Sequence, residues 1–91
     1  MDYLYMKHIP KIKLYGTKTC HKTNYYKTFL DEKKLPYQFL DVLENENHAD
    51  ELRNLYTNKK LNFPTIIIGN KKLRNPREAE LHKWFEKLIH S

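Results

Sequence analysis

Hydrophobic residues recur along the chain with two different periods, which separate predicted strands from predicted helices. Alternating or continuous apolar runs predict strands at residues 11–15, 37–42, 65–68 and 71–73. Apolar residues at helical spacing predict helices at residues 22–34, 49–56 and 76–89. The run Thr65-Ile-Ile-Ile68 is the strongest strand signal, because β-branched residues favour buried strands. The predicted order of elements is β-α-β-α-β-β-α.

The connecting segments agree with this order. Leu35-Pro36 ends the first helix, because the residue before a proline disfavours helical backbone. The first two strands and the helix between them predict a parallel pair with a right-handed crossover. Gly69-Asn70 predicts a hairpin turn, and Asn75-Pro76-Arg-Glu78 predicts a helix start with Asn75 as N-cap and Pro76 as first helical residue. We therefore predict an α/β fold with a four-stranded mixed sheet flanked by three helices.

The length of 91 residues predicts one domain, near the small end of what folds alone. Residues 1–10 show no clear period, so we predict an N-terminal extension at 1–10 and a domain at 11–91. No apolar run approaches the ~20 residues of a membrane span, and the first residues lack the charged-then-apolar order of a signal peptide. The single cysteine needs no oxidising compartment. We expect a cytoplasmic protein with no membrane partner.

The chain is basic, with 17 lysines and arginines against 11 acidic residues and a net charge of +6. The lysines are scattered rather than gathered in runs of five or six, which favours a solvated surface over a nucleic-acid site. Tyr25 and Tyr26 beside Lys22 and Lys27 would suit base stacking, but their spacing predicts one tyrosine in the core and one at the surface. We expect no nucleic-acid partner, although positive charge near Cys20 would steer an anionic thiol.

The only cysteine, Cys20, follows the first predicted strand and a polar turn, at the start of a helical segment. Unpaired backbone N–H groups and the helix dipole favour a thiolate there, and Lys18 and Lys22 add positive charge. Cysteines in such surroundings have pKa values lowered from ~8.5 to roughly 3.5–7.5. A buried structural cysteine is the alternative, but the neighbours Thr19 and His21 are too polar for a core site. We therefore predict that Cys20 is reactive.

Three short motifs follow one another along the chain. They are Tyr15-Gly-Thr-Lys-Thr-Cys20, Phe63-Pro-Thr65 and Leu73-Arg-Asn-Pro76. Together they resemble the glutaredoxin family, most closely its mycoredoxin-type members, which carry Asn-Pro where ordinary glutaredoxins have paired glycines. The resemblance covers nearly the whole chain after residue 10. It implies that the β-α-β-α-β-β-α order is that of the thioredoxin-like (glutaredoxin) fold.

The resemblance also implies a site around Cys20 that binds glutathione or another low-molecular-weight thiol as co-substrate. In the family, the proline that matches Pro64 is cis, and the backbone of the preceding residue, here Phe63, holds the extended substrate. The N–H groups that open the last helix, around Asn75 and Arg77, would bind a carboxylate of the thiol.

Two further positions join the predicted binding residues, and one departs from the family. Thr17 stands where most members have a basic residue, as it does in mycoredoxins, and His21 is either a local charge or proton carrier or a solvated surface histidine. Thr23 replaces the second cysteine of the Cys-x-x-Cys members, so an intramolecular disulfide cannot form, and its hydroxyl would donate a hydrogen bond to the thiolate. Because the Cys-Gly-Phe-Ser signature and any histidine ligand spacing are absent, we expect no metal.

Two classes of function fit these residues. The first is a thiol–disulfide oxidoreductase that uses a single cysteine for monothiol exchange and removes glutathione from mixed disulfides. Its partners would be a low-molecular-weight thiol and a disulfide-bearing or thiolated protein, and we expect a monomer. The alternative is a catalytically weak thioredoxin-fold module for binding or redox regulation, which the missing second cysteine and Thr17 suggest. Deglutathionylation rates with and without Cys20 distinguish the two.

Overall fold

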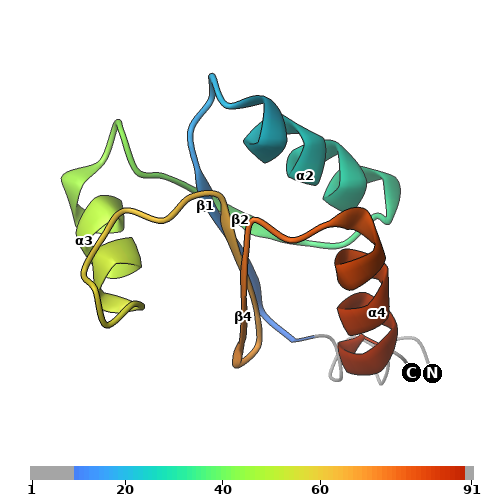
Figure 1. Cartoon of the computed structure of the whole chain (residues 1–91). Helices are drawn as coiled ribbons and strands as arrows, with labels where there is room; N and C mark the ends of the chain where they lie inside the picture. The colour runs from blue at the N-terminus through green and yellow to red at the C-terminus, as the bar shows by residue number, and fades with distance from the viewer. Residues whose placement is uncertain (1–9, 90–91) are drawn as a thin grey trace.

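The structure of the chain is a computed structural model that describes residues 10–89 (Figure 1). Its elements are β1 (Ile12–Gly16), α2 (His21–Glu32), β2 (Gln38–Asp41), α3 (Glu46–Asn54), β3 (Thr65–Ile68), β4 (Lys71–Arg74) and α4 (Glu78–Leu88). The predicted order of strands and helices is confirmed. Residues 1–9 of the predicted extension lie outside the described residues, so the domain boundary stays a prediction. Within residues 10–89, no helix is both long and apolar enough to cross a bilayer.

The four strands form one mixed sheet in the order β2-β1-β3-β4. As predicted, β1 pairs with β2 in parallel. β1 also pairs with β3, and β3 with β4, in antiparallel ladders. The β3–β4 hairpin turns at Gly69, whose φ of 61° is a left-handed conformation that glycine adopts without a Cβ penalty. The central strands β1 and β3 are thus hydrogen-bonded on both sides.

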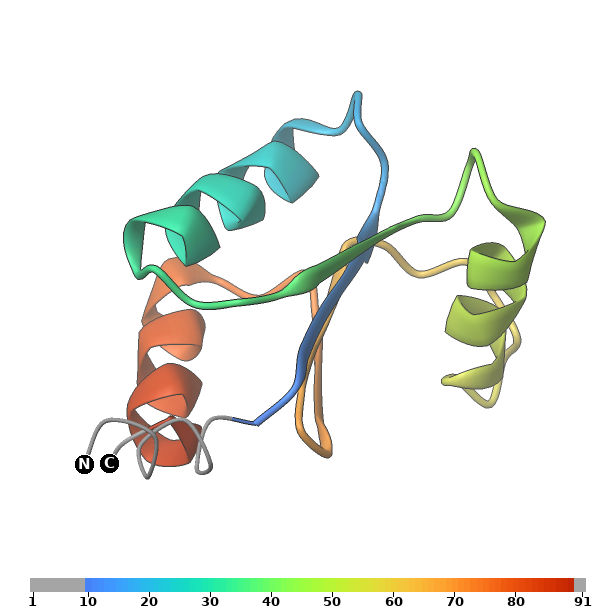
Figure 2. The ribbon, with the colours of Figure 1, turned by 180° about the vertical axis from the view of Figure 1, so that it is seen from behind.

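Helices α2 and α4 cover one face of the sheet, and α3 covers the other (Figures 1 and 2). Alternate side chains of the central strands point to opposite faces. Leu14 and Ile66 belong to the apolar cluster under α2 and α4 and are fully buried. Tyr15 and Ile67 belong to the second cluster, under α3. The sheet is therefore covered by helices on both faces, and its ends are left open.

The tyrosine pair of α2 divides as predicted between core and surface. Tyr26 is 1% exposed and lies in the larger cluster, whereas Tyr25 is 42% exposed. Their rings meet edge to face at 5.4 Å. Tyr25 is therefore an exposed aromatic side chain that packs against the buried ring of Tyr26.

Helix α3 begins and ends earlier along the chain than the predicted residues 49–56. It begins after the N-cap Asn45 and ends at Asn54, with Leu55 at the C-cap and 36% exposed. The prediction that Leu55 and Tyr56 belong to the buried face of this helix is therefore wrong. Tyr56 lies in the turn that follows, where it packs against the cluster under α3.

Helix α4 begins at Glu78, so the prediction of a helix start capped by Asn75 is wrong. Asn75 has a φ of 47°, a left-handed conformation that asparagine tolerates and that a helix cannot continue through. Its N–H donates to the carbonyl of Pro64 at 2.8 Å. Arg77 takes the N-cap position and makes no side-chain capping bond. Asn75 thus belongs to a turn between β4 and α4 instead of to the helix.

Candidate functional site

Three turns lie side by side at one end of the sheet, the upper end in Figure 1, and the strand register explains why. Tyr15 pairs with Thr65, and Thr65 pairs with Arg74. One step beyond these pairs lie the turn after β1, the turn before β3 and the turn after β4. The three sequence motifs that the resemblance used are therefore brought together at this end.

Cys20 is the N-cap residue of α2 and lies at the end of the first of these turns. Its carbonyl accepts the N–H of Asn24 at 3.0 Å, and its own N–H donates to the carbonyl of Thr17 at 3.3 Å. The side chain of Asn24 donates to the carbonyl of Lys18 at 3.0 Å, which braces the turn. Cys20 is a free cysteine and is partly exposed. The local backbone thus presents a single thiol at the start of a helix.

The surroundings of Cys20 lower its pKa. Partial burial acts in the opposite direction and raises the pKa, because it penalises the charged form. Hydrogen bonds from the hydroxyl and the N–H of Thr23 and from the N–H of Lys22 outweigh burial, and the charge of Lys22 adds to them. The thiolate therefore forms at lower pH than in an ordinary cysteine, and it is the thiolate that attacks disulfides.

Thr23, which replaces the family's second cysteine, is fully buried one turn into α2. Its hydroxyl oxygen accepts the N–H of Thr17 at 3.4 Å. A Cβ at Gly16 would lie 2.7 Å from Cγ2 of Thr23 and closer still to its hydroxyl. Thr23 therefore fills the space against the end of β1, and its hydroxyl serves both the turn and the thiolate.

We expect Thr23→Val to raise the pKa of Cys20, because the substitution keeps the branched shape and removes the hydroxyl that stabilises the thiolate. It should also lower the free energy of unfolding by about 1–3 kcal/mol, since the N–H of Thr17 loses its partner in a buried place. The pH dependence of iodoacetamide alkylation measures the pKa, and urea unfolding measures the stability.

Thr23→Ser is the matched control, because serine keeps the hydroxyl and loses only a methyl group. It should leave the pKa of Cys20 near that of the wild type. An unchanged pKa in Thr23→Val would show that the hydroxyl does not act on the thiolate.

The three charged or titratable neighbours of Cys20 have different surroundings. Lys22 is exposed, and its charge acts on the thiolate. The ammonium of Lys18 lies 3.1 Å from a carboxylate oxygen of Glu44. Lys18 is thus paired with Glu44, and of these three neighbours only Lys22 is among the causes that lower the pKa of Cys20. His21, the first residue of α2, is exposed.

The second turn carries a cis peptide bond between Phe63 and Pro64, as the resemblance implies. Pro64 is buried, and Phe63 packs against the cluster under α3. Among the described residues, the N–H and carbonyl of Phe63 have no hydrogen-bond partner, although the carbonyl of Pro64 has one. The backbone of Phe63 is therefore free to pair with an extended ligand.

Two side chains that the sequence analysis did not single out hold this turn in place. The hydroxyl of Thr65 donates to the carbonyl of Asn62 at 2.6 Å. That hydroxyl also lies 2.8 Å from the hydroxyl of Tyr56, which then acts as the donor. The first contact is local, three residues apart, whereas the second depends on how the turn after α3 folds back on β3.

The third turn is tied to α2 by Tyr26, a further residue that sequence reasoning assigned only to the core. Its hydroxyl donates to the carbonyl of Pro76 at 2.6 Å and lies 3.4 Å from the side-chain oxygen of Asn75. Asn75 in turn donates its N–H to Pro64. The helix that carries Cys20, the cis-proline turn and the start of α4 thus form one hydrogen-bonded frame.

The predicted anion site at the start of the last helix is changed by this arrangement. The N–H of Asn75 is taken by Pro64 and is not available to a ligand. The first free N–H groups are those after Arg77, whose side chain is exposed. Glu78 and Glu80 lie in the first helical turn and bring negative charge to it. Arg77 is therefore the stronger candidate of the two for a carboxylate ligand.

Across residues 10–89, no group of three or more His, Cys, Asp or Glu side chains is arranged to hold a metal ion. Within this described part of the chain, one buried polar atom, Nδ1 of His48, has no hydrogen-bond partner. It lies in α3, which covers the face of the sheet away from α2. What this end of the sheet offers is a thiol with a lowered pKa beside free backbone groups.

A family model described as Glutaredoxin matches residues 12–73. Among solved structures, the chain is similar to the glutaredoxin grx-1 from Archaeoglobus fulgidus, with a TM-score of 0.69 and 18% identity over 97% of this chain and 95% of that one. It is also similar to the thioredoxin-like protein BC3987, with a TM-score of 0.68 and 23% identity over 80% of this chain and 97% of that one. A search of curated protein sequences finds no match. At these identities the structural likeness supports the fold alone.

Proposed function

The chain belongs to the glutaredoxin family, and on that premise we propose that it is a monothiol thiol–disulfide oxidoreductase whose nucleophile is Cys20. The observation that carries the proposal is the lowered pKa of a partly exposed thiol at the N-cap of α2. Thr17 and the Asn75-Pro76 pair support a mycoredoxin-type member, since they match the motifs of that group.

In the first step, the Cys20 thiolate attacks the glutathione sulfur of a mixed disulfide between glutathione and a protein. A disulfide forms between Cys20 and glutathione, the original disulfide breaks, and the protein thiolate leaves and takes a proton from water. Lys22 and Thr23 keep Cys20 ionised for this attack.

In the second step, the thiolate of another glutathione attacks the glutathione sulfur bound to Cys20. Oxidised glutathione leaves, and the Cys20 thiolate is restored. The cycle consumes one glutathione thiol, because the other glutathione enters as part of the mixed disulfide, so no second protein cysteine is needed. This balance suits a chain in which Thr23 occupies the position of the resolving cysteine.

The remaining residues would position the co-substrate. The free N–H and carbonyl of Phe63 would pair with the backbone of glutathione or another low-molecular-weight thiol, with Pro64 fixing their direction. The side chain of Arg77 and the N–H groups after it would bind a carboxylate. Thr17 shapes the turn through its bond to Thr23, and His21 lies exposed beside Cys20.

A single-turnover experiment tests the proposal. The reduced chain is mixed with an excess of a glutathionylated peptide and no free thiol, and intact-protein mass spectrometry follows the products. We expect one glutathione on Cys20 for each peptide thiol released, because the first step can proceed while the second cannot.

Two other outcomes would contradict the proposal. Release of the peptide thiol without modification of Cys20 would mean that another group acts. A mixed disulfide between Cys20 and the peptide, in place of glutathione, would show attack on the wrong sulfur and would favour a redox-regulated binding module over an enzyme.

A further inference from the structure

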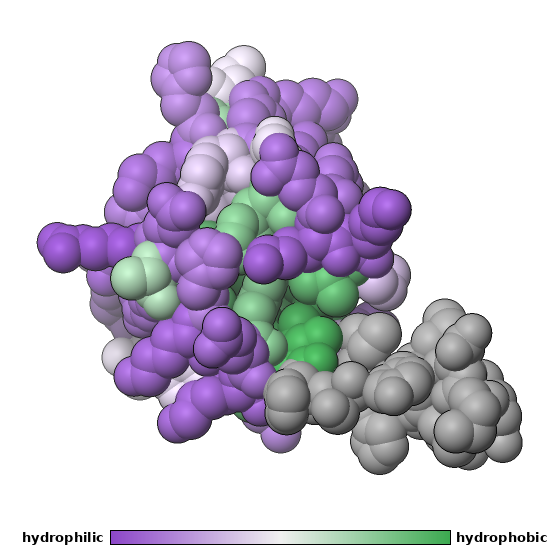
Figure 3. Space-filling view, turned by 90° about the vertical axis from the view of Figure 1, so that its right-hand side faces the viewer, coloured by the Kyte–Doolittle hydropathy of each residue, from purple (hydrophilic) through white to green (hydrophobic). Residues whose placement is uncertain are grey.

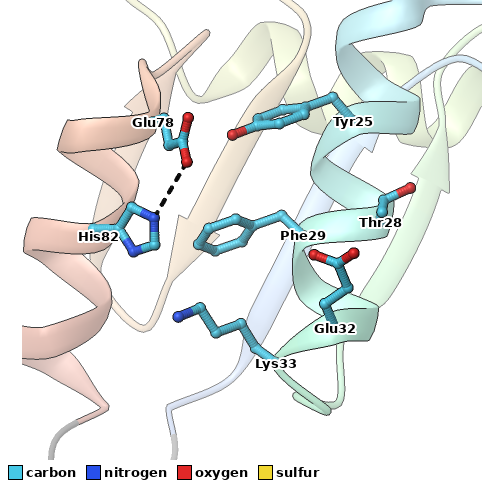
Figure 4. Close-up of a pocket in the computed structure, with 7 residues that line it drawn as sticks. All are labelled: Tyr25, Thr28, Phe29, Glu32, Lys33, Glu78 and His82. Carbon is cyan, nitrogen blue, oxygen red and sulfur yellow. Dashed lines mark ion pairs between the residues drawn. The ribbon is translucent and has the colours of Figure 1, made fainter.

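A cavity of about 320 Å³ lies between α2 and α4. Figure 4 shows the side chains that line it, which come from both helices: Tyr25, Thr28, Phe29, Glu32, Lys33, Glu78 and His82. The side of the molecule on which α4 lies is otherwise mostly hydrophilic, with a narrow apolar strip (Figure 3). The lining does not include Cys20 or the three turns around it, but Glu78 follows Arg77 directly, so the cavity adjoins the proposed thiol site at the start of α4.

The rings of Tyr25 and Phe29 and the imidazole of His82 form part of the cavity wall. Phe29 is almost fully buried and meets the ring of His82 edge to face at 5.2 Å. Tyr25 stands above it, exposed, with its hydroxyl directed toward Glu78 on the opposite helix (Figure 4). An aromatic face that is open to solvent attracts cations through its quadrupole, by an amount that grows as the cation is desolvated.

The carboxylates of Glu32 on α2 and Glu78 on α4 both act on the hydroxyl of Tyr25. The pKa of Tyr25 is raised, first by burial and then by the negative charges of Glu78 and Glu32. Glu78 also lies 3.6 Å from Nε2 of His82, yet its side chain remains 70% exposed. In a chain with a net charge of +6, this cavity is a local region that favours positive charge.

The chain's own Lys33 already places an ammonium here. Its Nζ lies 5.4 Å from the centroid of the Phe29 ring, at the lower edge of the cavity in Figure 4. Lys33 is exposed and free to turn away into water. The position of this side chain shows that a cation fits beside the ring, and it makes Lys33 a competitor for any cation from outside.

We propose that the cavity between α2 and α4 binds a basic side chain, arginine above all, of the protein that carries the mixed disulfide. A guanidinium can stack on an aromatic face and pair with a carboxylate at the same time, which matches the rings of Tyr25 and Phe29 and the carboxylates of Glu32 and Glu78. This inference rests on the proposed function, because it names the kind of protein substrate that Cys20 would meet.

The position of the cavity along α2 fits that role. Tyr25 is five residues after Cys20, a rise of about 7.5 Å along the helix axis. An extended peptide advances about 3.3 Å per residue. A substrate whose cysteine lies at Cys20 would therefore reach the cavity with a side chain roughly two to four residues away.

Binding of two peptides tests the inference independently of catalysis. Each peptide has a serine in place of the reactive cysteine, and they differ only at a residue three positions away, which is arginine in one and the neutral isostere citrulline in the other. Titrations of the Cys20→Ser chain, followed by NMR and fluorescence anisotropy at low salt, give their affinities. We expect the arginine peptide to bind about three- to tenfold more tightly. The net charge of +6 alone would favour the citrulline peptide.

Variants of the lining residues should change the preference for the arginine peptide in opposite directions. The Glu32→Gln/Glu78→Gln double variant should lose the preference for arginine, and Lys33→Gln should enlarge it by removing the competing ammonium. Glu80→Gln, which removes one carboxylate from the same turn of α4 outside the cavity, is the control for Glu78→Gln and should keep it. Equal affinity for both peptides, no binding of either, or a preference that survives the double variant would overturn the inference. Absence of glutathione transfer to Cys20 would instead overturn the proposed function and leave these affinities unaffected.

Discussion

Replacement of Cys20 by serine is expected to abolish deglutathionylation. The steady-state rate with a glutathionylated protein and excess glutathione should fall at least about 10³-fold, to the uncatalysed level, because a hydroxyl is not ionised at neutral pH and cannot form the intermediate disulfide. The fold should survive, since Cys20 is the N-cap of α2 and serine is among the residues preferred at that position. A coupled assay of oxidised glutathione measures the rate.

Urea unfolding of the same Cys20→Ser sample separates loss of chemistry from loss of structure. We expect a free energy of unfolding equal to or above that of the wild type, by up to about 1 kcal/mol. A substantial residual rate with a stable fold would mean that Cys20 is not the nucleophile. The chain would then be better described as a binding module.

Gly16→Ala is expected to damage both stability and exchange, although residue 16 carries no reactive group. The added Cβ would lie 2.7 Å from Cγ2 of Thr23, whose side chain is fully buried. Overpacking of this kind lowers the free energy of unfolding by about 1–3 kcal/mol. A displaced Thr23 hydroxyl should also raise the pKa of Cys20 and slow alkylation at neutral pH.

A double-mutant cycle identifies the contact responsible. Thr23→Ala removes the two nearest of the three side-chain atoms that the new Cβ would meet and leaves only Cβ, at 3.0 Å, so the destabilisation by Gly16→Ala should shrink in the Thr23→Ala background. Additive effects of the two substitutions would show that the close approach to Thr23 is not the cause. Urea unfolding of the four proteins gives the coupling free energy.

Local patterns were sufficient to predict most of the fold. The β-branched run at residues 65–68 is strand β3 with the predicted bounds. The parallel β1–β2 pair follows from the helix between the two strands, because parallel strands need a crossover. Leu14 and Ile66 are fully buried positions of the two central strands. A strand whose two faces are both covered carries apolar or hydrogen-bonded side chains on each face, so its sequence gives a clear strand signal.

The start of α4 was mispredicted because a tertiary contact overrides the local signal. Asn75, Pro76 and Glu78 form a capping pattern that is common at helix starts. In the fold, Pro64 takes the N–H of Asn75, and Tyr26 reaches both Asn75 and Pro76 with its hydroxyl. Tyr26 lies 49 and 50 positions before Asn75 and Pro76, so its contacts cannot be predicted from the four residues of the capping pattern.

The candidate site could be predicted only as far as its parts are local. The residues around Cys20 were enough to predict a thiol at the start of a helix. The strand signal at residues 65–68 was enough to place Pro64 at the start of β3. The ion pair between Lys18 and Glu44 could not be predicted from the sequence, because it depends on where the turn after β2 lies in the fold. The cavity beside Tyr25 likewise exists only once α2 and α4 pack together.

The pH dependence of Cys20 alkylation is the most direct test of the central claim, which is that the fold keeps this sulfur ionised. Iodoacetamide reacts with the thiolate, so the midpoint of the rate against pH gives the pKa. The same chain unfolded in urea supplies the reference, because it contains one cysteine. We predict a midpoint clearly lower in the folded chain than in the unfolded one. A folded midpoint equal to or above the unfolded value would contradict the account.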